Sequence, residues 1–328
     1  MSGNGDQDPP RLAVVVCTYN RSVSLRETLL SLFACGDPME RVDVLVVANH
    51  CSDDTLARVA EFEAAHPSTN LRLYWIEEST PGKSHALNAA LAYTEHETLC
   101  FVDDDQVIEA GFLRALLAGL RMHPQNDIFC GRIWPAWDGS EPAWVHAEAP
   151  YRIPIRPFPE FDLGTESREL VSDERLPSGG NITVRRRVFD RIGGFAVELG
   201  PTGHDLAGGE DHDFLQRALA AGFRIRYLPA VRQLHAIDPM RMRTGYVLKK
   251  SYLRSRSSFL IEPPAPGPRP YMLRKIVGHA VRALLAWHGD RRFHSLVRLA
   301  ASLGELAGAI DVARRPGVRP APGNARSH

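Results

Sequence analysis

The feature that most constrains the fold is a repeat of short apolar runs and helical patterns in the first hundred residues. Four short apolar runs are predicted to be strands: Leu12–Cys17, Val42–Ala48, Leu71–Ile76 and Thr98–Val102. The first is a continuous apolar, β-branched run, as expected for a strand that is covered on both faces, and the second is also predicted to be buried. Helical patterns separate these runs, over about 22–32, 54–65 and 85–93. This spacing predicts an α/β fold with a central, mostly parallel sheet and flanking helices.

Polar residues directly follow three of these strands. They occupy Thr18–Arg21, Asn49–Asp54 and Asp103–Asp105. In parallel sheets, ligands bind beyond the carboxyl ends of the strands. We therefore expect the three segments to meet at one rim of the sheet and to form a binding site there.

Three adjacent carboxylates, Asp103, Asp104 and Asp105, end the fourth strand. Adjacent carboxylates raise one another's pKa unless a cation neutralises them. Oxygen ligands favour a hard divalent cation such as Mn²⁺ or Mg²⁺, and alternate residues of an extended segment point to the same side. The run therefore predicts a divalent metal site that includes Asp103 and Asp105. The alternative is a solvated acidic turn.

A second acidic cluster has the sequence GGEDHDF and covers Gly208–Phe214. Its two glycines allow close approach of the backbone to a ligand. Glu210, Asp211 and Asp213 open a predicted helix that runs to about Ala221. Acidic residues in a first helical turn also stabilise the helix dipole. From these residues alone, both capping and catalysis remain open.

Composition narrows the class of protein. A hydrophobic fraction of 44% is enough for a buried core, and no stretch reaches the ~18 apolar residues of a membrane span. The five scattered cysteines lack Cys-x-x-Cys spacing, which predicts reduced thiols and neither a disulfide frame nor a zinc site. The polar start is unlike a signal peptide. We therefore expect a cytoplasmic globular protein.

The formal net charge of zero hides a strong asymmetry. Residues 241–328 hold 17 basic and four acidic residues, and the rest of the chain carries the opposite excess. Two basic amphipathic helices are predicted within 271–313. Such helices favour an anionic membrane surface, here the inner face of the membrane. The alternative is packing against the catalytic domain or a second subunit. We do not expect nucleic acid, because no recognition motif accompanies the charge.

Six segments together resemble the glycosyltransferase family 2 enzymes, which have the GT-A fold. They are VVVCTYNR, VVANHCSDDT, TPGKSHALNAAL, FVDDD, LPSGGNITVRR and GGEDHDFLQRALAAGFRIRYLP. The resemblance covers roughly Leu12 to Ile237. It implies an inverting, metal-dependent enzyme that moves a sugar from a nucleotide-sugar, expected to be a UDP-sugar, to a hydroxyl of a glycan, glycolipid or small molecule. A sugar-nucleotide nucleotidyltransferase and a non-catalytic nucleotide-sugar-binding scaffold are the alternatives.

The resemblance also implies roles for individual residues. Asp211, with Glu210 beside it, matches the catalytic base. Asp103 and Asp105 match the DxD metal pair, and His235 resembles a later histidine that completes the metal site in some relatives. The donor is assigned to Thr18, Tyr19, Asn20, Arg21, Asn49, Asp53, Lys83, Asn88, Asp103 and Asp104. The sugar and acceptor side is assigned to Gly179, Gly180, Asn181 and Gly209.

One departure from the family pattern concerns recognition of the base. The second strand of such enzymes usually ends in an aspartate, but this chain has Ala48 there. Asn49 or Asp53 would then have to read the base.

The expected domain plan has five parts. The catalytic domain spans 11–261, with a nucleotide-binding half at 11–105 and an acceptor half at 106–261. A disordered start (1–10) precedes it, and a proline-rich linker (262–270), the helical region (271–313) and a disordered tail (314–328) follow it. The proline-rich stretch Ala136–Pro177 is expected to be an irregular insert that shapes the acceptor pocket.

Overall fold

A computed structural model of the 328-residue chain describes residues 12–35, 40–67, 70–153, 158–171, 174–200, 209–261 and 267–314. Contacts within the chain divide it into two units. The first comprises Met1–Ala136 and Pro159–Ala236, and the second comprises Trp137–Phe158 and Ile237–His328.

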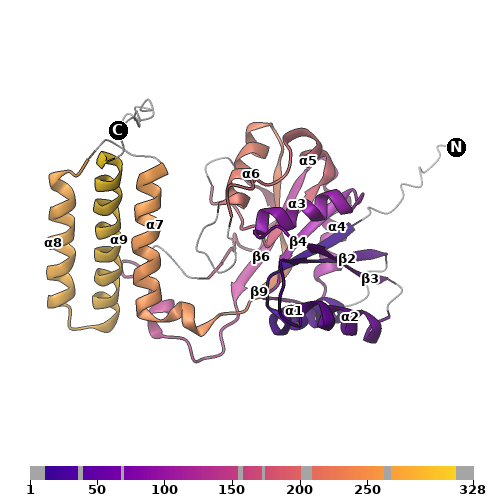
Figure 1. The fold of residues 1–328 in the computed structure, drawn as a ribbon, viewed down its shortest axis with the longest axis horizontal. Helices are drawn as coiled ribbons and strands as arrows, with labels where there is room; N and C mark the ends of the chain where they lie inside the picture. Colours follow the sequence, from indigo (N-terminus) through magenta and orange to yellow (C-terminus); the bar gives the residue numbers. More distant parts are fainter. Residues whose placement is uncertain are drawn as a thin grey trace. The chain divides into compact units, whose positions relative to one another are not determined.

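The first unit is built on a sheet that has nine strands among the described residues (Figure 1). In spatial order they are β3 (Leu71–Glu78), β2 (Val42–Asn49), β1 (Leu12–Thr18), β4 (Thr98–Asp103), β8 (Asn181–Arg185), β6 (Ile128–Pro135), β9 (Ile225–His235) and β5 (Gln106–Ile108), with β7 (Arg168–Glu169) paired to β9. The strands β1 to β4, β6 and β9 run in one direction, and β5, β7 and β8 run in the other. The predicted α/β fold with a mostly parallel sheet is confirmed.

Helices cover both faces of this sheet, so it has an apolar core on each side. On one face lie α1 (Ser22–Ala34), α2 (Thr55–Ala65) and α4 (Phe112–Met122). On the other lie α3 (Lys83–Tyr93), α5 (Arg186–Ile192) and α6 (Glu210–Ala220). The central strands β1, β2 and β4 are mostly apolar because most of their residues are buried on either face of the sheet. The sheet is therefore a rigid platform for the residues at its carboxyl rim.

The second unit is helical. It contains α7 (Thr244–Ile261), α8 (Pro270–Leu285), α9 (Gly289–Arg314) and the short 3₁₀ helices η1 (Ala143–His146) and η2 (Pro239–Met242). Helix α9 lies between α7 and α8 (Figure 1). A Cβ atom at Gly304 of α9 would lie 2.1 Å from the carbonyl oxygen of Tyr252, so this glycine allows α7 and α9 to approach closely. Across the residues that the structure covers, no helix combines the length and the apolar character needed to cross a bilayer.

This division differs from the predicted domain plan. The range 11–261 includes residues 137–158 and α7, which the structure groups with α8 and α9 because α7 and η1 both pack against α9. The stretch Ala136–Pro177 is shared between the two units rather than forming one insert. The two helical patterns within 271–313 correspond to α8 and α9. The predicted disordered start (1–10), most of the tail (314–328) and most of the linker (262–270) lie outside the described residues.

Candidate active site

Two of the three rim segments, Thr18–Arg21 and Asp103–Asp105, meet where β1 and β4 end side by side. The parallel register places Cys17 opposite Asp103, so the loop after β1 lies over the aspartate run. The Thr18 hydroxyl donates to Asp104 Oδ2 at 2.7 Å, and Arg21 Nη1 donates to carboxylate oxygens of Asp104 and Asp105, both at 2.9 Å. Burial raises the pKa of Asp104, although Arg21 acts in the opposite sense. Asp104 therefore joins the two rim segments.

Lys83 offsets part of the negative charge of the run. It is the first residue of α3, and its Nζ donates to Asp103 Oδ1 at 2.6 Å. Burial disfavours the ammonium charge, but the nearby carboxylates of Asp103, Glu210 and Asp211 outweigh it and raise the pKa of Lys83. Lys83 is therefore a permanent cation at the site.

The metal-ligand candidates come together at the end of β9. His235 is the last residue of this strand and pairs with Gln106 of β5, which directly follows the aspartate run. One ligand atom from each of Asp103, Asp105 and His235 lies within 4.8 Å of the others, and His235 Nε2 is 3.1 Å from Asp105 Oδ1. Burial alone would raise the pKa of Asp105, but His235 and Arg21 lower it. Two carboxylates and an imidazole at this spacing fit a divalent cation such as Mn²⁺.

Helix α6 positions the second acidic cluster. Gly209 has a φ of +119°, a conformation that favours glycine, and the helix begins at the next residue. Phe214 is fully buried in the core on the face of the sheet that α3, α5 and α6 cover, and this packing fixes the helix. The carboxylate of Asp211 accepts two backbone N–H groups: Oδ2 accepts from Gly179 at 2.7 Å and Oδ1 from His212 at 2.8 Å. These bonds hold Asp211 in one orientation.

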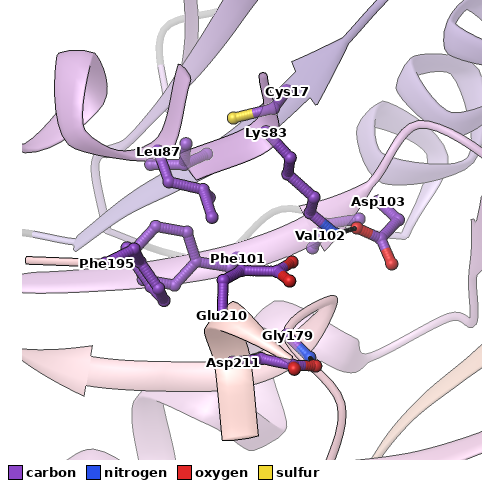
Figure 2. Close-up of a pocket in the computed structure, with 11 residues that line it drawn as sticks. Cys17, Lys83, Leu87, Phe101, Val102, Asp103, Gly179, Phe195, Glu210 and Asp211 are labelled. Atoms are coloured by element: carbon purple, nitrogen blue, oxygen red, sulfur yellow. Dashed lines mark hydrogen bonds and ion pairs between the residues drawn. The ribbon is translucent and has the colours of Figure 1, made fainter. Parts of the chain in front are cut away.

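The two acidic clusters line the same hollow (Figure 2). Figure 2 shows Lys83 extending to Asp103, with Asp211 beside Gly179. Burial raises the pKa of Glu210, which Lys83 only partly offsets. The hollow therefore places the candidate base and one of the candidate metal ligands around one space.

The backbone of Gly180 lies close against Asp103, one of the candidate metal ligands. A Cβ atom there would lie 2.2 Å from Asp103 Oδ2 and 2.7 Å from Gln106 Nε2. We expect Gly180→Ala to displace the Asp103 carboxylate and to weaken Mn²⁺ binding about 10–100-fold, as for other residues that orient metal ligands. Calorimetric titration with Mn²⁺ measures the effect. Gly245→Ala on α7, where a Cβ atom meets nothing within 4 Å, is the control. Equal Mn²⁺ affinity in both variants would contradict the expectation.

Two asparagines assigned to the ligands instead bind the protein backbone. Asn88 donates to the carbonyl of Phe195 at 2.8 Å and accepts its N–H at 2.9 Å. Asn181 pairs in the same way with Gly131, at 2.7 Å and 3.0 Å, and thereby links β8 to β6. Both amides are thus engaged by the backbone in this structure, and their assignment to the donor and to the sugar and acceptor side stays a prediction.

The loops that were expected to read the base are also tied to the fold. Asn49 donates to the carbonyl oxygens of Glu78 and Thr80 and accepts the N–H of Gly82. Asn20 accepts the N–H of Asp53, whose own carboxylate accepts the N–H of Thr55. The amide of Asn49 is therefore engaged on both sides by the backbone, and its role in base recognition stays a prediction. Asp53 remains at the rim and is exposed.

Sequence reasoning missed two buried glutamines beside the metal candidates. Gln106 accepts the N–H of Asp103 through Oε1 at 3.2 Å, and Gln233 donates to the carbonyl of Gly180 at 2.7 Å. Gln233 lies two residues before His235 in β9, so the two side chains share one face of the strand. The two-residue spacing of Gln233 and His235 in a predicted strand was the sequence signal that could have placed Gln233 beside the candidate metal site. The glutamines hold the backbone on which Asp103 and Gly180 lie.

Comparison with known proteins identifies the family. Residues 9–251 match the family model described as "Glycosyltransferase like family 2". The chain belongs to glycosyltransferase family 2. The predicted family resemblance is therefore confirmed. The probable glycosyltransferase YdaM of Bacillus subtilis is 25% identical over 221 residues, which are 67% of this chain and 49% of YdaM. The matched part of this family 2 chain thus spans about half the length of that relative.

Solved structures of glycosyltransferases share the fold. The mannosyltransferase PcManGT from Pyrobaculum calidifontis, in complex with GDP-Man and Mn²⁺, has a TM-score of 0.55 at 19% identity, and the match covers 90% of this chain and 87% of PcManGT. A fragment of S. aureus TarS in complex with UDP-GlcNAc has a TM-score of 0.54 at 18% identity, covering 92% and 91% of the two chains. These likenesses confirm the GT-A fold for this family 2 member.

Proposed function

We propose that this family 2 chain transfers a sugar from a nucleotide-sugar to an acceptor hydroxyl, with inversion at the anomeric carbon. The observation that carries the proposal is the shared hollow, in which Asp103 lies across from Asp211. A single displacement needs a base at the attacking oxygen and charge stabilisation at the leaving group. In this proposal the two acidic clusters would meet these needs separately.

Asp211 is the proposed base. Each of its carboxylate oxygens accepts one backbone N–H, from Gly179 or His212, and keeps a second lone pair. One of these lone pairs would take the proton of the acceptor hydroxyl. The hydroxyl oxygen then bonds to the anomeric carbon as the bond from that carbon to the diphosphate oxygen breaks. The nucleoside diphosphate leaves, and the proton stays on Asp211 until water removes it.

Asp103, Asp105 and His235 would hold Mn²⁺ or Mg²⁺. A bound divalent cation neutralises the charge that grows on the departing diphosphate. Lys83 and Arg21 are permanent cations beside the same carboxylates, bound to Asp103 and Asp105 respectively. They would orient those carboxylates toward the cation and, when the donor is present, would attract its phosphate oxygens. The GDP-Man and Mn²⁺ complex of PcManGT and the UDP-GlcNAc complex of TarS support a nucleotide-sugar as donor.

Donor turnover tests the proposal against its alternatives. We expect a UDP-sugar with Mn²⁺ to raise the melting temperature more than Mn²⁺ alone. At a donor concentration 100 times Kd, donor binding should add about 2.7 kcal/mol to the free energy of unfolding. GDP-Man is the comparison donor in the same measurement. We also expect slow release of nucleoside diphosphate without an acceptor, because water can take the acceptor's place. Release of pyrophosphate from a nucleoside triphosphate and a sugar phosphate would identify a nucleotidyltransferase. Donor binding without any turnover would identify a scaffold.

A further inference from the structure

Helix α8 carries apolar residues beyond the face that packs on α9. On the packed face, Met272 is buried against Ala309 and Val312. Beside that face, Leu273, Val277, Val281 and Leu284 are spaced three or four residues apart, and all four are exposed. A helix that packs by only one face should be polar on the other. The outer stripe of α8 is therefore available to a partner.

The stripe ends at the loop that joins α8 to α9. Leu284 is 83% exposed, Leu285 is 70% exposed and Trp287 is 97% exposed. We call the stripe together with Leu285 and Trp287 the α8 outer surface. Tryptophan at the end of an apolar stripe is typical of segments that lie at a lipid–water interface, because its ring is apolar and its N–H is polar.

The charge around this surface has one sign. Residues 267–289 contain four basic residues, Arg269, Arg274, Lys275 and Arg282, and no acidic one. Lys275 is paired with Glu305 of α9 at 3.0 Å. Arg274 follows the first residue of the stripe, and Arg282 lies between Val281 and Leu284 in the sequence; both are exposed. The α8 outer surface therefore combines apolar side chains with positive charge.

We infer that the α8 outer surface binds an anionic lipid membrane. Apolar side chains enter the interface, and the arginines pair with lipid phosphates. A second copy of the chain fits less well, because a two-fold contact through this surface would bring Arg274 and Arg282 of both copies together. This inference does not depend on the proposed transfer reaction, because every residue it uses lies outside the candidate active site.

Vesicle co-sedimentation of the full chain tests the inference. We expect binding to vesicles of phosphatidylcholine mixed with phosphatidylglycerol and little binding to phosphatidylcholine alone. The variant Leu284→Ser/Trp287→Ser should bind the mixed vesicles at least about tenfold less. Arg274→Gln/Arg282→Gln should also bind less, and high salt should reduce the binding of the unaltered chain. In the unaltered chain, brominated lipid should quench tryptophan fluorescence, and Trp287→Ser should lose most of that quenching.

A matched control removes apolar exposure elsewhere. Val23 is 73% exposed on α1 and Met122 is 71% exposed on α4, so Val23→Ser/Met122→Ser removes two exposed apolar side chains from the first unit. This control should bind vesicles like the unaltered chain. Equal loss in both double variants, or no preference for phosphatidylglycerol, would overturn the inference. It would also be overturned if ultracentrifugation without lipid showed a dimer that Leu284→Ser/Trp287→Ser dissociates. Donor hydrolysis in solution should be the same in all these variants.

Discussion

Replacing Asp211 by asparagine should lower the rate of sugar transfer by about 10²–10⁴-fold while leaving the affinity for the donor unchanged. Asparagine has the shape of the carboxylate and keeps one oxygen that can accept from Gly179 or His212. Its amide cannot take a proton from the acceptor hydroxyl at neutral pH. Single-turnover transfer and a donor titration measure the two quantities separately. Full transfer activity in Asp211→Asn would place the base elsewhere.

Asp213 provides the control for this prediction. It lies two residues later, in the same first turn of α6, and binds Arg217 at 2.8 Å. Asp213→Asn removes the same negative charge from the helix N-terminus, so it should cost about 0.3–1 kcal/mol of stability. Transfer activity should change little, because the side chain pairs with Arg217. A loss equal to that of Asp211→Asn would mean that both carboxylates act by stabilising the helix.

The parallel half of the sheet could be predicted from the sequence because each strand carries its own signal. The strands β1, β2 and β4 are buried on both faces, and each is a short apolar run followed directly by polar residues, a length and flanking that favour a strand over a helix. The remaining strands depend on distant partners. Strand β8 lies between β4 and β6 and is antiparallel to both. The local sequence of β8 does not predict this strand order, because the order depends on pairing with strands that are distant in the sequence.

The same distinction separates the candidate site residues. Asp103, Lys83 and Asp211 line one hollow as their motifs suggested, since each motif fixes a charged side chain at the end of a strand or the start of a helix. Asn88 and Asn181 instead bind Phe195 and Gly131, which are 107 and 50 residues away in the chain. An amide can bind either a ligand or a backbone, and only the three-dimensional structure determines which is within reach.

Removing both outer aspartates of the run should abolish the dependence of donor binding on metal. In Asp103→Ala/Asp105→Ala the donor should no longer bind more tightly when Mn²⁺ is added, and transfer should fall about 10²–10³-fold or more, because charge on the leaving diphosphate is no longer neutralised. Donor titrations with and without Mn²⁺ measure the first effect. A thermal melt is needed beside them, because Lys83 and Arg21 each lose a carboxylate partner.

The variant Asp104→Asn is the control, because it tests whether the response to Mn²⁺ depends on Asp103 and Asp105 or only on the total negative charge of the three aspartates. Asp104 is buried and engaged by Thr18 and Arg21, so its loss should lower stability but leave the response to Mn²⁺ in place. An unaltered response to Mn²⁺ would show that the outer pair, whose carboxylates cluster with His235, holds the cation. If Asp104→Asn lost the response as completely as Asp103→Ala/Asp105→Ala, the run would act only through its total charge. If the double variant kept a normal response, the cation would bind at a different site, and Lys83 would be the main group left beside the hollow to stabilise the departing diphosphate.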